Sequence, residues 1–173
     1  MISVIVPALN EEGQIEATLK SLANQSLENE SYEIILVDGG SGDRTVEIAK
    51  EYADKVIVQT HPGIGGARRD GAEVASGQII AFTDADTAFP KGWLEVISKN
   101  LERHEASTGP VIFQDGDLRT EILRAVRSSY KLLQAFNFCY MIGSNMAMRK
   151  ETYRRTGGHR DISLLDDYDL SVK

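Results

Sequence analysis

The chain has 173 residues, and its composition of 42% hydrophobic and 26% charged residues suits one compact domain and is too apolar for a disordered acidic chain. A formal net charge of −7 argues against non-specific nucleic-acid binding, which normally needs a basic excess. The single cysteine, Cys139, excludes an internal disulfide and a zinc site built from cysteines. The first residues lack the basic start of a signal peptide, and no apolar stretch approaches the roughly 18 residues of a membrane span. We therefore expect a cytoplasmic protein.

Four short runs rich in Val and Ile predict β-strands in the first half of the chain. The expected strands are Ile2–Val6, Glu33–Val37, Val56–Gln59 and Gln78–Thr83. Between them, apolar spacing predicts helices over 15–22 and 46–53, and an Ala- and Glu-rich helix over 67–75 ends before Gly77. Strand and helix alternating in this way predict an α/β fold with a parallel sheet covered by helices on both faces.

The second half of the chain departs from this rhythm. The patterns predict a helix over 91–103, a strand over 108–114, a long amphipathic helix over 117–136, a strand over 141–148 and a short helix over 150–155. Basic residues flank the apolar stripe of the amphipathic segment, so it could lie on a membrane surface, although packing into the core is the favoured interpretation. No linker separates the halves, which predicts a single domain over 1–173.

Polar and acidic segments follow the expected strands, at the edge of a parallel sheet where ligands bind. These segments are 7–12, 38–43, 61–69 and 84–86. Asp84 and Asp86 come directly after a buried strand and can direct oxygen atoms at one divalent cation, as Mg²⁺ and Mn²⁺ prefer. The alternative is a surface turn, in which Asp is common. Asp84 and Asp86 are expected at the same edge of the sheet as the other polar segments, and this position favours the cation site over a surface turn.

Two Gly-rich segments could approach a phosphorylated ligand. Asp38 begins a strand-to-helix turn in which its carboxylate could accept hydrogen bonds from a base or ribose, or simply form the turn. Residues 63–68 match the first two glycines of the dinucleotide fingerprint, but Arg68 stands where the third small residue is required. Arg68 and Arg69 suit a diphosphate or a base, with solvated helix charge as the alternative.

Three acidic residues lie within the four positions 166–169 near the end of the chain. Mutual repulsion between such close carboxylates can raise a pKa toward that of a general base. The alternative is a helix N-terminus, where acidic side chains complement the helix dipole.

Six segments in this order resemble glycosyltransferase family 2, the inverting nucleotide-sugar transferases with the GT-A fold. They are residues 2–12, 37–45, 66–71, 82–86, 143–158 and 166–170. Each segment is weak alone, but their order is highly specific. The resemblance implies a Rossmann-like GT-A fold, with a mostly parallel central sheet flanked by helices. It also implies a nucleotide-sugar-binding half over 1–86 and an acceptor-binding and catalytic half over 87–173.

The same resemblance implies roles for individual residues. Contacts with the nucleotide sugar are expected from Pro7, Asn10, Glu11, Asp38, Arg68, Asp84 and Ala85. Asp86, together with Asp84, is expected to hold Mn²⁺ or Mg²⁺. Asp167, together with Asp166, is expected to be catalytic, with Asp167 deprotonating the acceptor hydroxyl. Gly157, Gly158 and His159 are expected on the acceptor side, with a solvated loop position as the alternative for His159.

The chain departs from the family pattern at three positions, with Arg69 in place of Asn, Asp166 in place of Glu and His159 where an aromatic residue is common. The Gln-x-x-Arg-Trp element of processive synthases is absent, which disfavours a polymerase. The expected donor is a UDP-sugar, with GDP- and dTDP-sugars as alternatives, and the expected acceptor is a saccharide or a lipid-linked molecule. We expect no nucleic-acid partner, and the amphipathic segment allows peripheral contact with the inner face of the membrane.

Two other functions stay open. A sugar-phosphate nucleotidyltransferase would need a Gly-rich basic loop directly after the first strand, where this chain has the acidic segment 7–12. A non-catalytic nucleotide-sugar-binding domain is the third possibility. It is kept open because the sequence stops at Lys173, shortly after the expected catalytic motif. We expect either a short member of the family or a chain that ends near its natural terminus.

Overall fold

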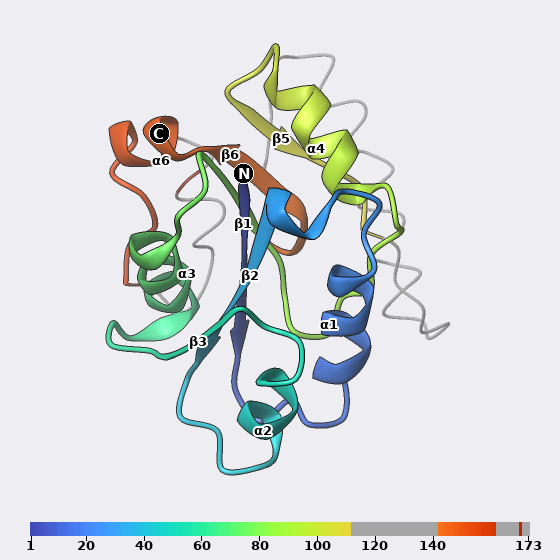
Figure 1. Cartoon of the computed structure of the whole chain (residues 1–173). Coiled ribbons are helices and arrows are strands. Elements are labelled where there is room, and N and C mark those ends of the chain that lie inside the picture. The colour runs from blue at the N-terminus through green and yellow to red at the C-terminus, as the bar shows by residue number, and fades with distance from the viewer. Residues whose placement is uncertain (112–141, 162–169, 171–173) are drawn as a thin grey trace, which may run out of the picture.

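A single six-stranded sheet forms the centre of the computed structural model, which describes residues 1–111, 142–161 and 170 (Figure 1). The strands are β1 (Ile2–Ala8), β2 (Tyr32–Asp38), β3 (Lys55–Val58), β4 (Ile79–Phe82), β5 (Ala106–Thr108) and β6 (Met146–Arg149). Their spatial order is β3-β2-β1-β4-β6-β5. The strands β1 to β4 are parallel, and β6 runs antiparallel to both β4 and β5. The expected mostly parallel sheet is therefore confirmed.

Helices cover both faces of this sheet (Figure 1). One face carries α1 (Ile15–Ala23), α2 (Thr45–Ala49) and α4 (Trp93–Leu101), and the other carries α3 (Gly63–Val74) and α6 (Lys150–Arg155). The short 3-10 turns η1 (Asn29–Ser31) and η2 (Gly143–Asn145) complete the described elements. Because successive strand side chains point to opposite faces, β1 contributes Val4 and Val6 to one core cluster and Ile5 to the other. Burial on both faces explains the continuous apolar runs in the sequence.

Several boundaries differ from the predictions. The third helix begins at Gly63 and not at residue 67, since the Gly-rich segment forms its first turns. The second ends at Ala49 and not at residue 53. The strand expected over 108–114 lies at Ala106–Thr108, and residues 112–114 fall outside the described part. Residues 143–145 form η2, so the next strand begins only at Met146.

The amphipathic segment expected over 117–136 lies outside the described residues. Among the helices that the structure describes, none is long and apolar enough to cross a membrane.

Candidate functional site

A cavity of about 720 Å³ opens at the carboxyl ends of β1, β2, β3 and β4. The residues that line it come from the end of β1 and from the segments that follow each of these four strands. They are Pro7, Ala8, Leu9, Glu11, Gly39, Gln59, Thr60, His61, Pro62, Gly63, Ile64, Ala67, Asp84, Ala85 and Asp86. The polar strand ends seen in the sequence therefore meet at one place.

The acidic wall of the cavity contains Glu11, Asp84 and Asp86. Burial, followed by the negative charges of Asp86, Asp43 and Asp84, raises the pKa of Glu11 above its usual range. These carboxylates are therefore close enough to repel one another, and a positive charge in the cavity would relieve that repulsion.

Arg68 on α3 contacts Asp84 of this wall. It is not among the described residues that line the cavity. Its side chain is only 3% exposed, and Nη2 donates a hydrogen bond to Asp84 Oδ1 at 2.7 Å. A Cβ at Gly143 would lie 2.6 Å from both terminal nitrogens of Arg68, so only glycine leaves room for the guanidinium there. Arg68, which the sequence predicts to contact the nucleotide sugar, thus orients the carboxylate of Asp84.

Helix α1 holds the segment that carries the two aspartates. The Thr18 hydroxyl donates to the carbonyl of Ala85 at 2.7 Å, in a buried hydrogen bond. Further along the helix, Ser21 accepts from the Phe89 amide at 3.1 Å, and Gln25 Nε2 donates to the Pro90 carbonyl at 3.1 Å. Residues 85–90 are therefore fixed against a regular element of the core.

Asn10 links two loops and Asp38 stabilises the turn that follows it, and neither is among the described lining residues. Asn10 adopts a φ of 56°, and its Oδ1 accepts a hydrogen bond from the Gly42 amide at 2.8 Å. Asp38 is 6% exposed and accepts hydrogen bonds from the amides of Gly40 and Ser41. Both side chains shape the rim between β1 and β2, and their contact with a nucleotide stays a prediction.

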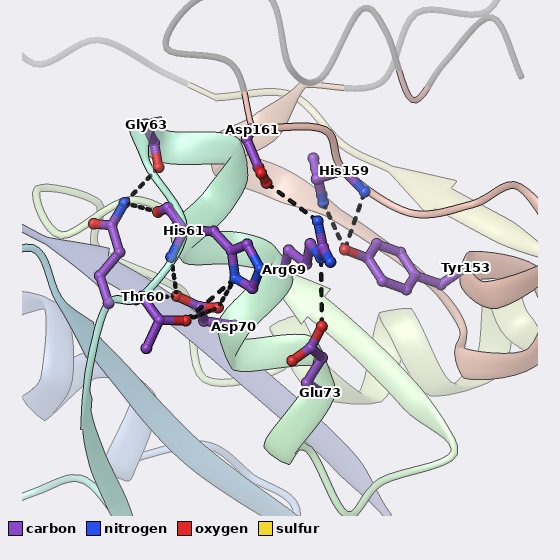
Figure 2. Close-up of polar contacts among 10 residues, drawn as sticks. Thr60, His61, Gly63, Arg69, Asp70, Glu73, Tyr153, His159 and Asp161 are labelled. Atoms are coloured by element: carbon purple, nitrogen blue, oxygen red, sulfur yellow. Dashed lines mark hydrogen bonds and ion pairs between the residues drawn. The ribbon is translucent and has the colours of Figure 1, made fainter.

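The residues expected on the acceptor side are packed into the fold. Gly157 and Gly158 have φ values of 80° and 65°, which glycine adopts without strain. His159 is 1% exposed and lies edge-on against Phe82 at 4.7 Å between ring centroids. Its amide donates to the Tyr153 hydroxyl at 3.1 Å (Figure 2). The alternative of a solvated loop histidine is therefore wrong, and contact with an acceptor is untested. Asp166 and Asp167 lie outside the described residues.

Arg69, which departs from the family pattern, pairs with acidic residues on α3 and beyond. Its Nε lies 3.3 Å from Glu73, and its Nη1 lies 3.3 Å from Asp161 (Figure 2). Arg69 is not among the described residues that line the cavity.

Gln59, Thr60 and His61, between β3 and α3, also line the cavity; the sequence places His61 in a polar segment after a strand but assigns no role to any of the three residues. Behind these residues lies Asp70, which is 5% exposed and whose Oδ1 is 2.5 Å from His61 Nδ1 (Figure 2). No local pattern in the sequence marks this pairing, because the burial of Asp70 on the inner face of α3 is seen only in the structure. A buried carboxylate needs partners.

Within residues 1–111, 142–161 and 170, no three His, Cys, Asp or Glu side chains are arranged to hold a metal ion. Carboxylate oxygens of Asp84 and Asp86 are nevertheless ligands of the kind that hard cations take. Mg²⁺ is commonly bound by one or two carboxylates together with substrate phosphates. The donor set at this wall therefore fits a divalent cation whose other ligands come from a phosphorylated substrate.

A sequence model described as glycosyl transferase family 2 matches residues 3–157. The putative glycosyltransferase EpsH of Bacillus subtilis is 41% identical over 99 residues, which cover 54% of this chain and 27% of that protein. The probable glycosyltransferase YdaM of the same organism is 28% identical over 192 residues, which cover 99% of this chain and 46% of that protein. The chain thus spans less than half the length of these relatives.

Solved structures show the same fold. The mannosyltransferase PcManGT from Pyrobaculum calidifontis superposes with a TM-score of 0.76 and 24% identity, over 97% of this chain and 50% of that one. Staphylococcus aureus TarS 1-349 superposes with a TM-score of 0.70 and 20% identity, over 98% of this chain and 53% of that one. With a cavity at the carboxyl ends of its parallel strands, the chain has the GT-A fold and belongs to glycosyl transferase family 2.

Proposed function

We propose that this chain transfers a sugar from a nucleoside diphosphate to an acceptor hydroxyl and inverts the anomeric configuration. The observation that carries the proposal is the cavity at the ends of β1 to β4, with Glu11, Asp84 and Asp86 on one wall. Family membership supplies the reaction class. A volume of about 720 Å³ lies within the usual range for small-molecule sites.

Asp86, together with Asp84, would hold Mn²⁺ or Mg²⁺ at this wall. When bound, the cation supplies electrostatic stabilisation of the charge that develops on the leaving diphosphate. Two neighbours support this assignment, since PcManGT was solved with GDP-Man and Mn²⁺. Glucosyl-3-phosphoglycerate synthase of Mycobacterium tuberculosis was solved with UDP and Mn²⁺.

The protein side chains divide the remaining work. Arg68 holds the Asp84 carboxylate in one orientation through the 2.7 Å hydrogen bond, and Thr18 holds the peptide of Ala85 between the two acids. The predicted base Asp167, together with Asp166, would take the proton of the acceptor hydroxyl as its oxygen attacks the anomeric carbon. A single displacement inverts that centre without a covalent nucleophile. The first donor to test is a UDP-sugar, since TarS was solved with UDP-GlcNAc.

The test is an assay of sugar transfer and donor hydrolysis with UDP-, GDP- and dTDP-sugars in the presence of Mn²⁺. We expect Asp86→Asn and Asp167→Asn each to lower kcat/KM by about 100-fold or more, as losses of transition-state electrostatics and of a general base do. The matched control is Glu102→Gln, at the exposed end of α4 and away from the cavity. Parent activity in both aspartate variants would refute the assigned chemistry.

The same protein preparation distinguishes the other two functions. Release of pyrophosphate from a nucleoside triphosphate and a sugar phosphate would identify a nucleotidyltransferase. Donor binding with neither hydrolysis nor transfer would identify a non-catalytic binding domain.

A further inference from the structure

The backbone between the two aspartates of the cavity wall is held by a hydroxyl that comes from behind the wall. Thr18 on α1 donates from Oγ1 to the carbonyl of Ala85 at 2.7 Å, and Thr18 is not among the described residues that line the cavity. Thr18 is 1% exposed and Ala85 is 4% exposed, so solvent does not compete for this hydrogen bond. In such a low dielectric the hydrogen bond is stronger than it would be at the surface.

The hydroxyl of Thr18 is directed away from its own helix. A threonine inside a helix commonly donates to the carbonyl four residues earlier. For Thr18 that carbonyl belongs to Gln14 and lies 3.5 Å away, much farther than the carbonyl of Ala85. The helix is itself anchored in the core by Leu19 and Leu22, which are fully buried. Thr18 is therefore a rigidly placed donor for residue 85.

The carbonyl of Ala85 belongs to the peptide that joins Ala85 to Asp86. Because a peptide unit is planar, a contact at its oxygen also fixes the position of the Asp86 Cα. The Asp86 carboxylate has little support of its own. Among the residues that the structure describes, it accepts one hydrogen bond, from the Thr87 hydroxyl at 3.4 Å. The point from which the Asp86 side chain extends is therefore set by Thr18.

Asp84 and Asp86 are anchored from opposite faces of the sheet. Arg68 on α3 contacts the carboxylate of Asp84, and Thr18 on α1 contacts the peptide that precedes Asp86. These two helices pack in separate core clusters. Burial, together with the nearby negative charges of both aspartates, raises the pKa of Glu11, which lines the same cavity. The two carboxylates therefore share one side of the cavity, and both layers of helices determine their spacing.

A cation that two carboxylates bind depends on the spacing between them. Mg²⁺ requires a near-ideal octahedron of oxygen atoms at about 2.0–2.1 Å, whereas Ca²⁺ accepts irregular arrangements at about 2.3–2.6 Å. A pair of carboxylates with a fixed spacing can favour the smaller ion. Loosening the pair would cost more affinity for Mg²⁺ than for Ca²⁺.

We infer that Thr18 is a positioning residue of the cation site, and that its hydroxyl sets the preference of Asp84 and Asp86 for Mg²⁺ over Ca²⁺. The inference rests on the proposed function, because it assumes that a divalent cation and a nucleoside diphosphate bind at these carboxylates.

The test compares Thr18→Val, which keeps the size of the side chain and removes the hydroxyl, with Thr18→Ser, which keeps the hydroxyl. Mn²⁺ is titrated into each protein with UDP present, and the electron paramagnetic resonance of free Mn²⁺ gives the Kd after subtraction of the Mn²⁺ that UDP binds alone. Mg²⁺ and Ca²⁺ are then added as competitors. We expect Thr18→Val to bind Mn²⁺ about tenfold more weakly, as loss of a supporting hydrogen bond behind a metal site does. It should also lose more affinity for Mg²⁺ than for Ca²⁺, whereas Thr18→Ser should bind as the parent does.

The matched control is Ser26→Ala, because it also removes a hydroxyl that holds the segment after the two aspartates. Ser26 Oγ donates to the Lys91 carbonyl at 2.8 Å, farther along the chain from Asp86. This variant should keep the ratio of Mg²⁺ to Ca²⁺ affinity of the parent protein. Thr18→Ala is measured in parallel, since it removes the hydroxyl without placing a methyl group against the carbonyl of Ala85.

Three results would overturn the role of Thr18 and leave the proposed function intact. They are parent affinity in the variants that lack the hydroxyl, equal losses of Mg²⁺ and Ca²⁺ affinity in those variants, and a loss in Thr18→Ser as large as that in Thr18→Val. A parent protein that takes up no Mn²⁺ beyond the amount held by UDP would overturn the proposed cation site itself, and this inference with it.

Discussion

At the scale of single residues, Glu33 on β2 shows how a buried charge is stabilised away from the site. Its carboxylate accepts hydrogen bonds from Ser3 Oγ at 2.6 Å and the Ser76 amide at 2.6 Å, and lies 2.8 Å from Lys55 Nζ. Burial raises the pKa of Glu33, but these partners outweigh it and lower the pKa from 4.5 to about 2. As the folded pKa is depressed, the unfolded chain takes up the proton first, and the stability that Glu33 contributes is present above pH 4.5. It is lost as the pH falls toward 2. The shift corresponds to about 3 kcal/mol in the free energy of unfolding.

We therefore expect Glu33→Gln to flatten the decline in the free energy of unfolding between pH 4.5 and 2, measured by urea denaturation at several pH values. Glu30→Gln, at an exposed position of η1, should keep the slope of the parent protein. Equal slopes in all three proteins would contradict this account of Glu33.

At the scale of elements, the contact between α3 and β1 depends on a glycine. A Cβ at Gly71 would lie 2.5 Å from Ile5 Cγ2 and 3.0 Å from Val37 Cγ2, in the packed core between helix and sheet. We expect Gly71→Ala to lower the free energy of unfolding by about 1–3 kcal/mol through overpacking, although alanine favours helix by about 1 kcal/mol. The measurement is the midpoint of thermal unfolding. Gly13→Ala, where a Cβ meets nothing within 4 Å, is the control, and a Gly71→Ala midpoint as high as the control's would disprove tight packing.

At the scale of the whole molecule, the cavity joins the segments after four strands, so an occupant connects parts of the chain that are far apart in sequence. A ligand that binds only the folded state stabilises it by about 2.7 kcal/mol at a hundredfold excess over Kd.

We expect UDP with Mn²⁺ to raise the melting temperature more than UDP with EDTA, because a cation relieves the repulsion at Glu11, Asp84 and Asp86. Asp86→Asn should remove only the difference that Mn²⁺ makes. An equal rise with and without EDTA would argue against a cation at this wall.

Much of the fold could be predicted because local patterns carry it. The continuous runs at Ile2–Val6 and Glu33–Val37 are strands, since a strand buried on both faces is mostly apolar along its whole length. Of the residues expected to contact the nucleotide sugar, Pro7, Glu11, Asp84 and Ala85 line the cavity, whereas Asn10, Asp38 and Arg68 are not among its described lining residues. The sequence predicts that this helix begins at residue 67, because glycine runs usually indicate loops. In the structure α3 begins at Gly63, and close packing against the backbone of His61 requires glycine at position 66.

By itself the sequence determined the strand and helix order, the mostly parallel sheet, the family and the acidic character of one wall, because periodicity and motif order are properties of neighbours along the chain. The tertiary structure alone decided which side chains meet: that Arg68 binds Asp84, that His159 is buried against Phe82, and that Asp70 binds the ring of His61. Such pairings depend on how α3 and the loops at both sheet faces pack in three dimensions. No local pattern encodes these distances, since each joins residues on separate elements or separate turns of the fold.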